Sequence, residues 1–211
     1  MYPSQEETNI IVFCRAPVPG HCKTRLVRKY GRLGAAKIAH LLLNNTLHKL
    51  LENNKHNLEL CCTPNPSHPV FLAARRKYKY AHLACSRQLG SDLGQRMFHA
   101  ARRMLSRTSF VLLVGTDCPE MTLSYVEKAI GKLQQGSPVV IGPANDGGYV
   151  LLGLSVAEPR LFDGLAWGSD QVLKQTLGNC RRLKIEAELL TPLSDIDDPH
   201  DWQKWKRKAL S

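Results

Sequence analysis

A single carboxylate follows an apolar run in the middle of the chain. Residues 110–114 are five consecutive apolar side chains, a pattern typical of a strand buried on both faces of a parallel sheet. Gly115 and Thr116 come next, so Asp117 is the first ionisable group beyond the carboxyl end of that strand. Open α/β sheets bind their ligands at this end of the strands. Asp117 is therefore a candidate ligand-binding group, although aspartate is common in turns and a structural role is an equal alternative.

Two cations follow the first predicted strand. Residues 9–14 form a short apolar run, and the loop after them turns at Pro17 and Gly20 before it reaches Lys23 and Arg25. A strand-to-loop passage that carries two cations suits a nucleotide phosphate. The spacing is not that of a Walker loop, because the second glycine before Lys23 is missing. Paired cations in loops are often only surface charge, so this pattern alone does not decide between the two interpretations.

A second group of carboxylates lies near the C-terminus. Asp195 and Asp197 alternate with Ile196, so in an extended segment their side chains project from the same face. Two such carboxylates can hold a hard divalent cation together with water and phosphate oxygens. Asp198 and Asp201 precede a predicted amphipathic helix, and acidic residues at a helix N-terminus are explained equally well without a ligand.

The sequence Asp146-Gly147-Gly148 can bring the backbone close to a ligand, because glycine adopts positive φ freely. An Asp-Gly pair between two apolar runs also predicts an ordinary β-hairpin, and taken alone that structural interpretation is the stronger one. Trp167 presents a similar choice, since its ring can stack on a substrate or pack into the core.

A glycine-rich turn at residues 88–94 precedes another predicted helix. Asp92 is placed to cap this helix, which extends to about Leu105. The functional alternative is a loop that passes under a nucleobase or ribose, with Asp92 as a nucleotide-binding residue. The residues alone favour helix initiation.

Apolar periodicity and turn residues predict the elements that position these groups. Predicted strands cover residues 9–14, 57–63, 80–85, 110–114, 138–142, 150–154 and 182–190. Predicted helices cover residues 34–52, 69–76, 92–105, 123–133, 169–177 and a C-terminal segment that includes Trp202 and Trp205.

Length and composition are those of an ordinary globular protein. The 211 residues, of which 43% are apolar and 22% charged, can bury a sizeable core and predict a single domain over residues 1–211. No apolar run approaches the roughly 20 residues that span a bilayer. The first residues are polar and include Glu6 and Glu7, unlike a signal peptide, so we expect a cytoplasmic protein.

The seven cysteines show no C-x-x-C spacing, which argues against a zinc site or a disulfide framework.

The formal charge of +11 suggests a polyanionic partner, either nucleic acid or phosphorylated small molecules. The basic residues are scattered over many predicted elements. No zinc finger, helix-turn-helix signature or aromatic RNA-binding strand accompanies them, so nucleic acid is not the expected partner.

Five motifs in a fixed order resemble a known superfamily. They are Ala-Pro-x-Pro-Gly-x-x-Lys-Thr-Arg-Leu at 16–26, Asp-Leu-Gly-x-Arg-Met at 92–97, Gly-Thr-Asp-Cys-Pro at 115–119, Gly-Pro-Ala-x-Asp-Gly-Gly-Tyr at 142–149 and Ser-Asp-Ile-Asp-x-Pro-x-Asp at 194–201. With them the chain resembles the nucleotide-diphospho-sugar transferases, and within these the bacterial rSAM/selenodomain-associated transferases. It is similar, more distantly, to guanylyltransferases of the molybdenum-cofactor and phospholactate pathways. The resemblance implies a single-domain, Rossmann-like GT-A fold, a three-layer α/β/α sandwich with a mostly parallel central sheet.

The resemblance also implies a role for each matching residue. Asp117 would bind Mg²⁺ or Mn²⁺ with the diphosphate, and Asp197, with Asp195 behind it, would complete the metal site. Asp146 is the candidate catalytic base. The implied nucleotide-binding residues are Ala16, Pro17, Gly20, Lys23, Arg25, Asp92, Gly115 and Thr116. The implied acceptor-binding residues are Gly147, Gly148, Tyr149 and Trp167.

The activity implied is that of a metal-dependent transferase with a nucleotide-activated donor. The first expectation is a glycosyltransferase that uses a nucleotide-diphospho-sugar and a small-molecule acceptor. The second is a guanylyl- or cytidylyltransferase-like enzyme that uses a nucleoside triphosphate and releases pyrophosphate. A non-catalytic nucleotide- or nucleic-acid-binding protein is a third possibility of a different class.

Overall fold

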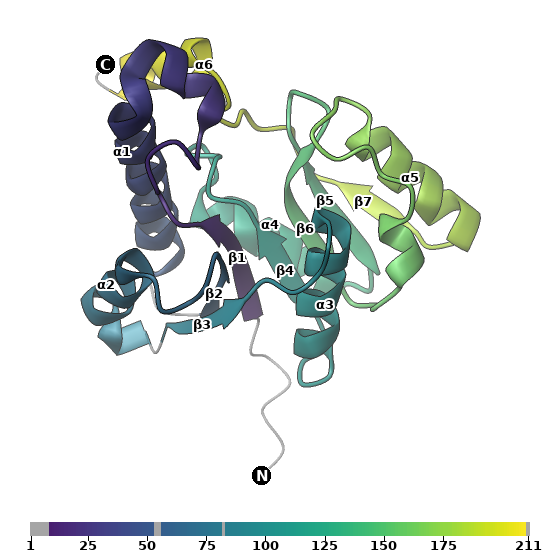
Figure 1. Cartoon of the computed structure of the whole chain (residues 1–211). Coiled ribbons are helices and arrows are strands. Elements are labelled where there is room, and N and C mark those ends of the chain that lie inside the picture. The colour runs from purple at the N-terminus through teal and green to yellow at the C-terminus, as the bar shows by residue number, and fades with distance from the viewer. Residues whose placement is uncertain (1–8, 53–55, 82, 210–211) are drawn as a thin grey trace.

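The computed structural model describes residues 9–52, 56–81 and 83–209, and its centre is a seven-stranded sheet (Figure 1). The strands are β1 (Asn9–Arg15), β2 (Asn57–Thr63), β3 (Ala84–Arg87), β4 (Val111–Val114), β5 (Val139–Pro143), β6 (Tyr149–Leu154) and β7 (Ala187–Leu189). Their order in the sheet is β3-β2-β1-β4-β6-β5-β7. Only β6 runs antiparallel to its neighbours among these strands, so the predicted mostly parallel sheet is confirmed.

Helices cover both faces of this sheet, which gives three layers. The helices α1 (Thr24–Leu50), α2 (Pro69–Lys77) and α4 (Leu123–Gln134) pack on one face, and α3 (Leu93–Leu105) and α5 (Val172–Leu183) pack on the other. The last helix, α6 (Pro199–Ala209), lies beside α1 at the top of Figure 1. Within the described ranges, no helix has the length and apolarity needed to cross a membrane.

Burial on both faces explains the apolar strands. Successive side chains of a strand point to opposite faces, and along β4 Leu112 joins the core under α1 and α4 whereas Leu113 joins the core under α3 and α5. All four residues of β4 are buried, and β4 lies in the centre of the sheet as predicted. The side chains that follow β4 are thus held by a rigid strand.

The short connection between β5 and β6 explains the reversed strand. Residues 144–148 join the two strands, and so short a connection allows a hairpin but no parallel crossover. The hairpin interpretation of the Asp146-Gly147 pair is therefore correct. It leaves Asp146 in a loop at the same edge of the sheet as the end of β4, because β5 and β4 run in the same direction.

Three predicted elements besides the first helix are wrong in their bounds. Tyr80 lies in a 3₁₀ turn, Lys79–Ala81, and the edge strand begins at Ala84 instead. The predicted strand 182–190 shortens to β7, because α5 continues to Leu183 and ends in a Schellman motif with Lys184 at φ 57°. Helix α5 begins at Val172 rather than at residue 169.

The largest difference is the start of α1. Periodicity predicts a helix from residue 34, but the structure begins it at Thr24 and kinks it at Gly31, which has φ 69° and ψ 169°. The apolar stripe of the first turns is short, with Leu26 as its buried residue, so helical periodicity does not reveal this segment. The extension matters because it places Lys23 and Arg25 at a helix start.

Candidate active site

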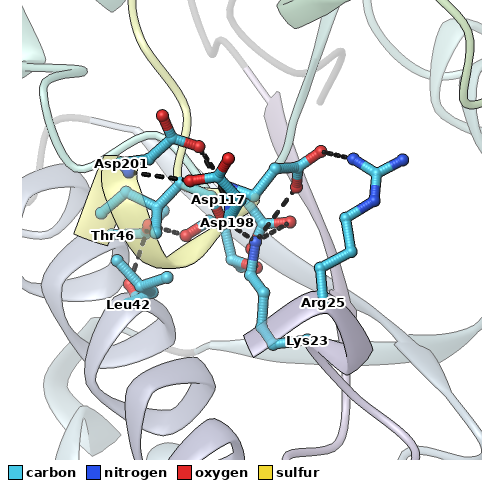
Figure 2. Close-up of polar contacts among 10 residues, drawn as sticks. Lys23, Arg25, Leu42, Thr46, Asp117, Asp198 and Asp201 are labelled. Carbon is cyan, nitrogen blue, oxygen red and sulfur yellow. Dashed lines mark hydrogen bonds and ion pairs between the residues drawn. The ribbon is translucent and has the colours of Figure 1, made fainter. Parts of the chain in front are cut away.

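Lys23 is the centre of the polar site. Its ammonium lies 2.9 Å from Asp117 Oδ2 and 3.5 Å from Asp197 Oδ1, and it donates a hydrogen bond to the carbonyl of Ile196 (Figure 2). The Lys23 side chain is only 7% exposed, so these contacts are partly shielded from water. The cation therefore joins the end of β4 to the segment that precedes α6.

The backbone at Lys23 adopts a conformation that is uncommon for a side chain with a Cβ atom. Lys23 is the N-cap of α1 with φ 44° and ψ 48°, and its side chain makes no capping hydrogen bond. A left-handed residue other than glycine costs on the order of 1–2 kcal/mol. The acceptors on Asp117, Ile196 and Asp197 hold the side chain and offset this cost.

Other contacts fix the carboxylates from both sides. Arg25 Nη1 lies 3.0 Å from Asp197 Oδ2. The Ile196 amide donates to the Asp117 carbonyl at 2.8 Å. Thr46 of α1 donates to the carbonyl of Leu42 at 3.1 Å and to that of Thr116 at 3.4 Å (Figure 2). These contacts therefore fix the segment around Asp117 and the segment around Asp197 relative to each other.

In the part of the chain that the structure describes, Asp197 also belongs to one of two groups of side chains that could hold a metal ion; the other is Asp198, His200 and Asp201. Asp146, Asp195 and Asp197 each place an oxygen within 4.8 Å of the others. Burial, and then the negative charges of Asp146 and Asp197, raise the pKa of Asp195 to about 6. The predicted metal ligands Asp195 and Asp197 thus lie together with Asp146, whereas the predicted ligand Asp117 is paired with Lys23.

The carboxylates of Asp198 and Asp201 serve the helix N-terminus. Asp198 Oδ1 accepts hydrogen bonds from the amides of His200 and Asp201, at 2.7 and 2.9 Å. Asp201 Oδ2 accepts from the amides of Asp197 and Asp198, at 3.2 and 3.0 Å. These bonds satisfy orphan amides at the start of α6, so the structural interpretation of these two residues is confirmed.

A basic cavity of about 510 Å³ opens on one side of Lys23. Its lining includes the predicted Lys23, Arg25, Gly115 and Thr116. It also includes four polar residues that the sequence did not single out, namely Arg15, His21, Gln88 and Arg96. Arg15 directly follows the apolar residues of β1 and could have been found from its position. Arg96 belongs to the motif at 92–97 and Gln88 to the turn before it, but no spacing rule places either residue beside the first loop.

Four predicted nucleotide-binding residues do not line this cavity. Ala16 is buried in the core, and its amide donates to the carbonyl of Thr63. Pro17 and Gly20 shape the loop without facing the cavity. Asp92 caps α3 by accepting from the amide of Gln95 at 2.9 Å, which confirms its structural interpretation.

An apolar cavity of about 290 Å³ lies on the other side of the Arg25–Asp197 pair. Tyr149, Trp167 and Gly148, three of the predicted acceptor-binding residues, line it, and the two rings meet edge to face at 6.3 Å between centroids. Asp146, Asp195 and Asp197 line the same cavity. The two cavities share Phe13, Arg25, Leu93, Gly115 and Asp197, so a ligand can extend from one into the other.

Gly147 has a packing role. It has φ 91°, and a Cβ atom there would lie 2.2 Å from the carbonyl oxygen of Asp170. The Gly147 carbonyl in turn accepts a hydrogen bond from the amide of Leu173 at 2.9 Å. The glycine thus fixes the Asp146 loop against the start of α5.

Replacing Gly147 with alanine is expected to destabilise the protein by about 2–4 kcal/mol, because the added methyl group collides with backbone and the left-handed φ adds strain. Thermal unfolding checks this. Gly164→Ala is the matched control, since Gly164 also has a positive φ of 67° but no atom within 4 Å of an added Cβ. Equal losses for the two variants would contradict the packing role.

Ionisation of Asp195 is expected to lower the stability of the folded protein. The folded value of about 6 exceeds the ordinary 3.8, so ionisation opposes folding; the cost grows from about pH 4 to 6 and is complete above pH 6. We expect Asp195→Asn to raise the Tm at pH 8 by several degrees, at about 2–4 °C per kcal/mol, and to give a much smaller gain near pH 3.5. A gain that is equal at both pH values would contradict this origin.

Comparisons with known proteins agree with this architecture. Residues 46–169 match the family described as an uncharacterized protein conserved in bacteria, DUF2064. A structure from Desulfovibrio desulfuricans G20, provisionally described as a nucleotide-diphospho-sugar transferase, is 31% identical over 95% of this chain and 87% of its own, with a TM-score of 0.83. No curated protein matches the sequence.

More distant structures share the fold. The 4-diphosphocytidyl-2C-methyl-D-erythritol synthase of Anaerococcus prevotii DSM 20548 has a TM-score of 0.67 and 9% identity, with 99% of this chain and all of that chain covered. A CMP:2-keto-3-deoxy-manno-octonic acid synthetase complexed with CTP has a TM-score of 0.59 and 7% identity, with 97% and 99% covered. Because the family model spans more than half of the sequence, the chain belongs to the DUF2064 family, within the nucleotide-diphospho-sugar transferase superfamily.

Proposed function

We propose that this protein is a metal-dependent transferase that uses a nucleotide-activated donor, and that the reaction is glycosyl transfer from a nucleotide-diphospho-sugar. The observation that carries the proposal is the pair of cavities that share Phe13, Arg25, Leu93, Gly115 and Asp197. In the first cavity four cations outnumber two carboxylates, and the second is lined by apolar side chains and carboxylates. The nucleotide diphosphate of the donor would lie in the first cavity, with the transferred sugar at the shared residues and the acceptor in the second cavity.

The basic cavity suits the nucleotide diphosphate. Arg15, Lys23, Arg25 and Arg96 converge on it from β1, the start of α1 and α3. Guanidinium and ammonium groups bind phosphate oxygens through charge-assisted hydrogen bonds. The relatives described as nucleotide-diphospho-sugar transferase and as CTP-bound synthetase support a nucleotide here.

The three-carboxylate group suits Mg²⁺ or Mn²⁺. Its donors are all hard carboxylate oxygens. Burial and then the charges of Asp146 and Asp197 raise the pKa of Asp195, and a divalent cation would relieve the repulsion among these carboxylates. Asp195 and Asp197 would hold the ion, which when bound neutralises charge on the diphosphate, and Asp146 beside them would stay free to act as the base. Asp117 would instead orient Lys23, the neighbouring cation.

The chain's own residues would position the reactants and move one proton. The acceptor oxygen forms a bond to the anomeric carbon, the bond from that carbon to the diphosphate oxygen breaks, and the electron pair leaves with the nucleoside diphosphate. Asp146 Oδ2 would take the acceptor proton, because Oδ1 already accepts a hydrogen bond from the Gly148 amide at 2.9 Å. Lys23 and Arg25 would stabilise the leaving diphosphate.

Product analysis separates glycosyl transfer from nucleotidyl transfer. Purified protein with Mn²⁺ is incubated with nucleotide sugars and, separately, with nucleoside triphosphates, each with a panel of small acceptors. Glycosyl transfer releases a nucleoside diphosphate from a nucleotide sugar. Release of pyrophosphate from GTP or CTP, without nucleotide-sugar turnover, would establish the nucleotidyltransferase alternative instead.

The distribution of charge favours polyanion binding as a second candidate function. Residues 64–110 carry nine Lys and Arg against the single carboxylate Asp92, a net +8 of the total +11. Arg75 and Arg76 line a cavity beside the edge strand β3, and Arg87 and Arg102 line another. Oligonucleotide binding that weakens with salt and with Arg87→Gln plus Arg102→Gln would support this candidate; binding unaffected by these changes would exclude it.

A further inference from the structure

The lining of the 290 Å³ cavity is selective in its chemistry. Its walls are largely apolar and include Phe13, Leu93, Met97, Leu113, Tyr149 and Trp167. These side chains come from β1, α3, β4, β6 and the loop before α5, so rigid elements shape most of the wall. The volume suits one compact molecule with a ring-sized apolar body.

The charged groups of this cavity leave no positive charge for an anionic acceptor. Asp146, Asp195 and Asp197 contribute up to three negative charges, and Arg25 is the one Lys or Arg among the lining residues that the structure describes. Arg25 is already paired with Asp197 at 3.0 Å. A bound divalent cation would raise the net charge of these side chains only to zero. Its positive charge would already be neutralised by the donor diphosphate.

The neighbouring cavity has the opposite character. Arg15, Lys23, Arg25 and Arg96 line it against the two carboxylates Asp117 and Asp197, so its net charge is positive. A phosphate group on a ligand is therefore drawn to that cavity and away from the carboxylates. The division separates a donor half from an acceptor half.

We propose that the acceptor is an uncharged alcohol or phenol with a compact apolar body, bound in the 290 Å³ cavity with its hydroxyl toward Asp146. This inference rests on the proposed transferase function and narrows it, because it excludes acceptors that carry a phosphate or carboxylate. The apolar wall supplies affinity through burial of the acceptor body. The carboxylates reject anionic analogues through repulsion and loss of hydration.

The probes are benzyl alcohol and benzyl phosphate, which share a ring and differ in charge. Binding is measured by saturation-transfer NMR titration with and without Mn²⁺. Met97→Trp fills the cavity from α3, and Ser169→Trp fills it from the loop before α5, so one variant remains if the other fails to fold. Binding of a nucleoside diphosphate to the basic cavity is measured on the same samples.

We expect benzyl alcohol to bind the unaltered protein and to lose at least tenfold in affinity in either filled variant, with nucleoside diphosphate binding retained. Benzyl phosphate binding should not change in these variants, because its phosphate is held by the basic cavity. The proposal is overturned if benzyl phosphate binds tenfold more tightly than the alcohol and loses that binding in the filled variants, or if alcohol binding is absent or unaffected. Failure of nucleoside diphosphate binding alone would contradict the proposed function and not the acceptor cavity.

Discussion

Replacing Asp197 with alanine is expected to lower transferase turnover by on the order of 10³-fold, about 4 kcal/mol of transition-state stabilisation. Asp197 contributes to both halves of the site, since it belongs to the three-carboxylate group and also pairs with Arg25 and Lys23. Its loss removes a candidate metal ligand, leaves Arg25 without this partner and removes one of the two carboxylates beside Lys23. Steady-state kinetics at several Mn²⁺ concentrations measures the effect.

The matched control for this change is Asp163→Ala, which removes an exposed carboxylate outside both cavities. It should retain full turnover. If excess Mn²⁺ restores the turnover of the Asp197 variant completely, the residue contributes only to metal affinity. Unchanged turnover without added metal would contradict its place in the site.

Replacing Lys23 with methionine should weaken nucleoside diphosphate binding by at least 10–100-fold, because a central phosphate-binding cation is lost. The same change should also destabilise the protein by about 1–3 kcal/mol. Lys23 is 7% exposed, and without its ammonium Asp117 and Asp197 repel each other across the gap that it fills. Calorimetric titration and thermal unfolding report the two effects separately.

The double variant Lys23→Met with Asp117→Asn distinguishes these two roles. Removing the Asp117 charge should recover a large part of the lost stability but none of the nucleotide affinity. Lys37→Met, which removes an exposed lysine from the same helix, should change neither property. A double variant with full nucleotide affinity would show that Lys23 acts on stability alone.

Much of the fold is predictable because it depends on local patterns. The buried run of β4 and the cap Asp92 follow directly from residue types, and the structure confirms both. The misplaced bounds have local causes that periodicity does not report. The left-handed Lys184 ends α5 and displaces the predicted last strand, and the kink at Gly31 separates the first turns of α1 from its apolar stripe.

The site is only partly predictable because its members meet through tertiary structure. The motifs indicate Lys23, Arg25, Asp195 and Asp197, and the structure brings these four residues together. No spacing rule reveals that Lys23 pairs with Asp117, since 94 positions separate them in the sequence. The structural and the functional interpretation of the Asp146 loop are compatible. The loop is an ordinary β-turn connection between two strands, and it also places the Asp146 carboxylate in the cavity.

Calorimetric titration of a nucleoside diphosphate, with and without Mn²⁺, tests the central claim most directly. The panel should include the uridine, guanosine and cytidine forms, and each is titrated into the unaltered protein and the Asp197→Ala variant. We predict that Mn²⁺ tightens binding of at least one of them by tenfold or more in the unaltered protein, and that the variant loses this gain. Binding that is equally tight without metal, and unchanged in the variant, would contradict a metal–diphosphate site at the end of β4.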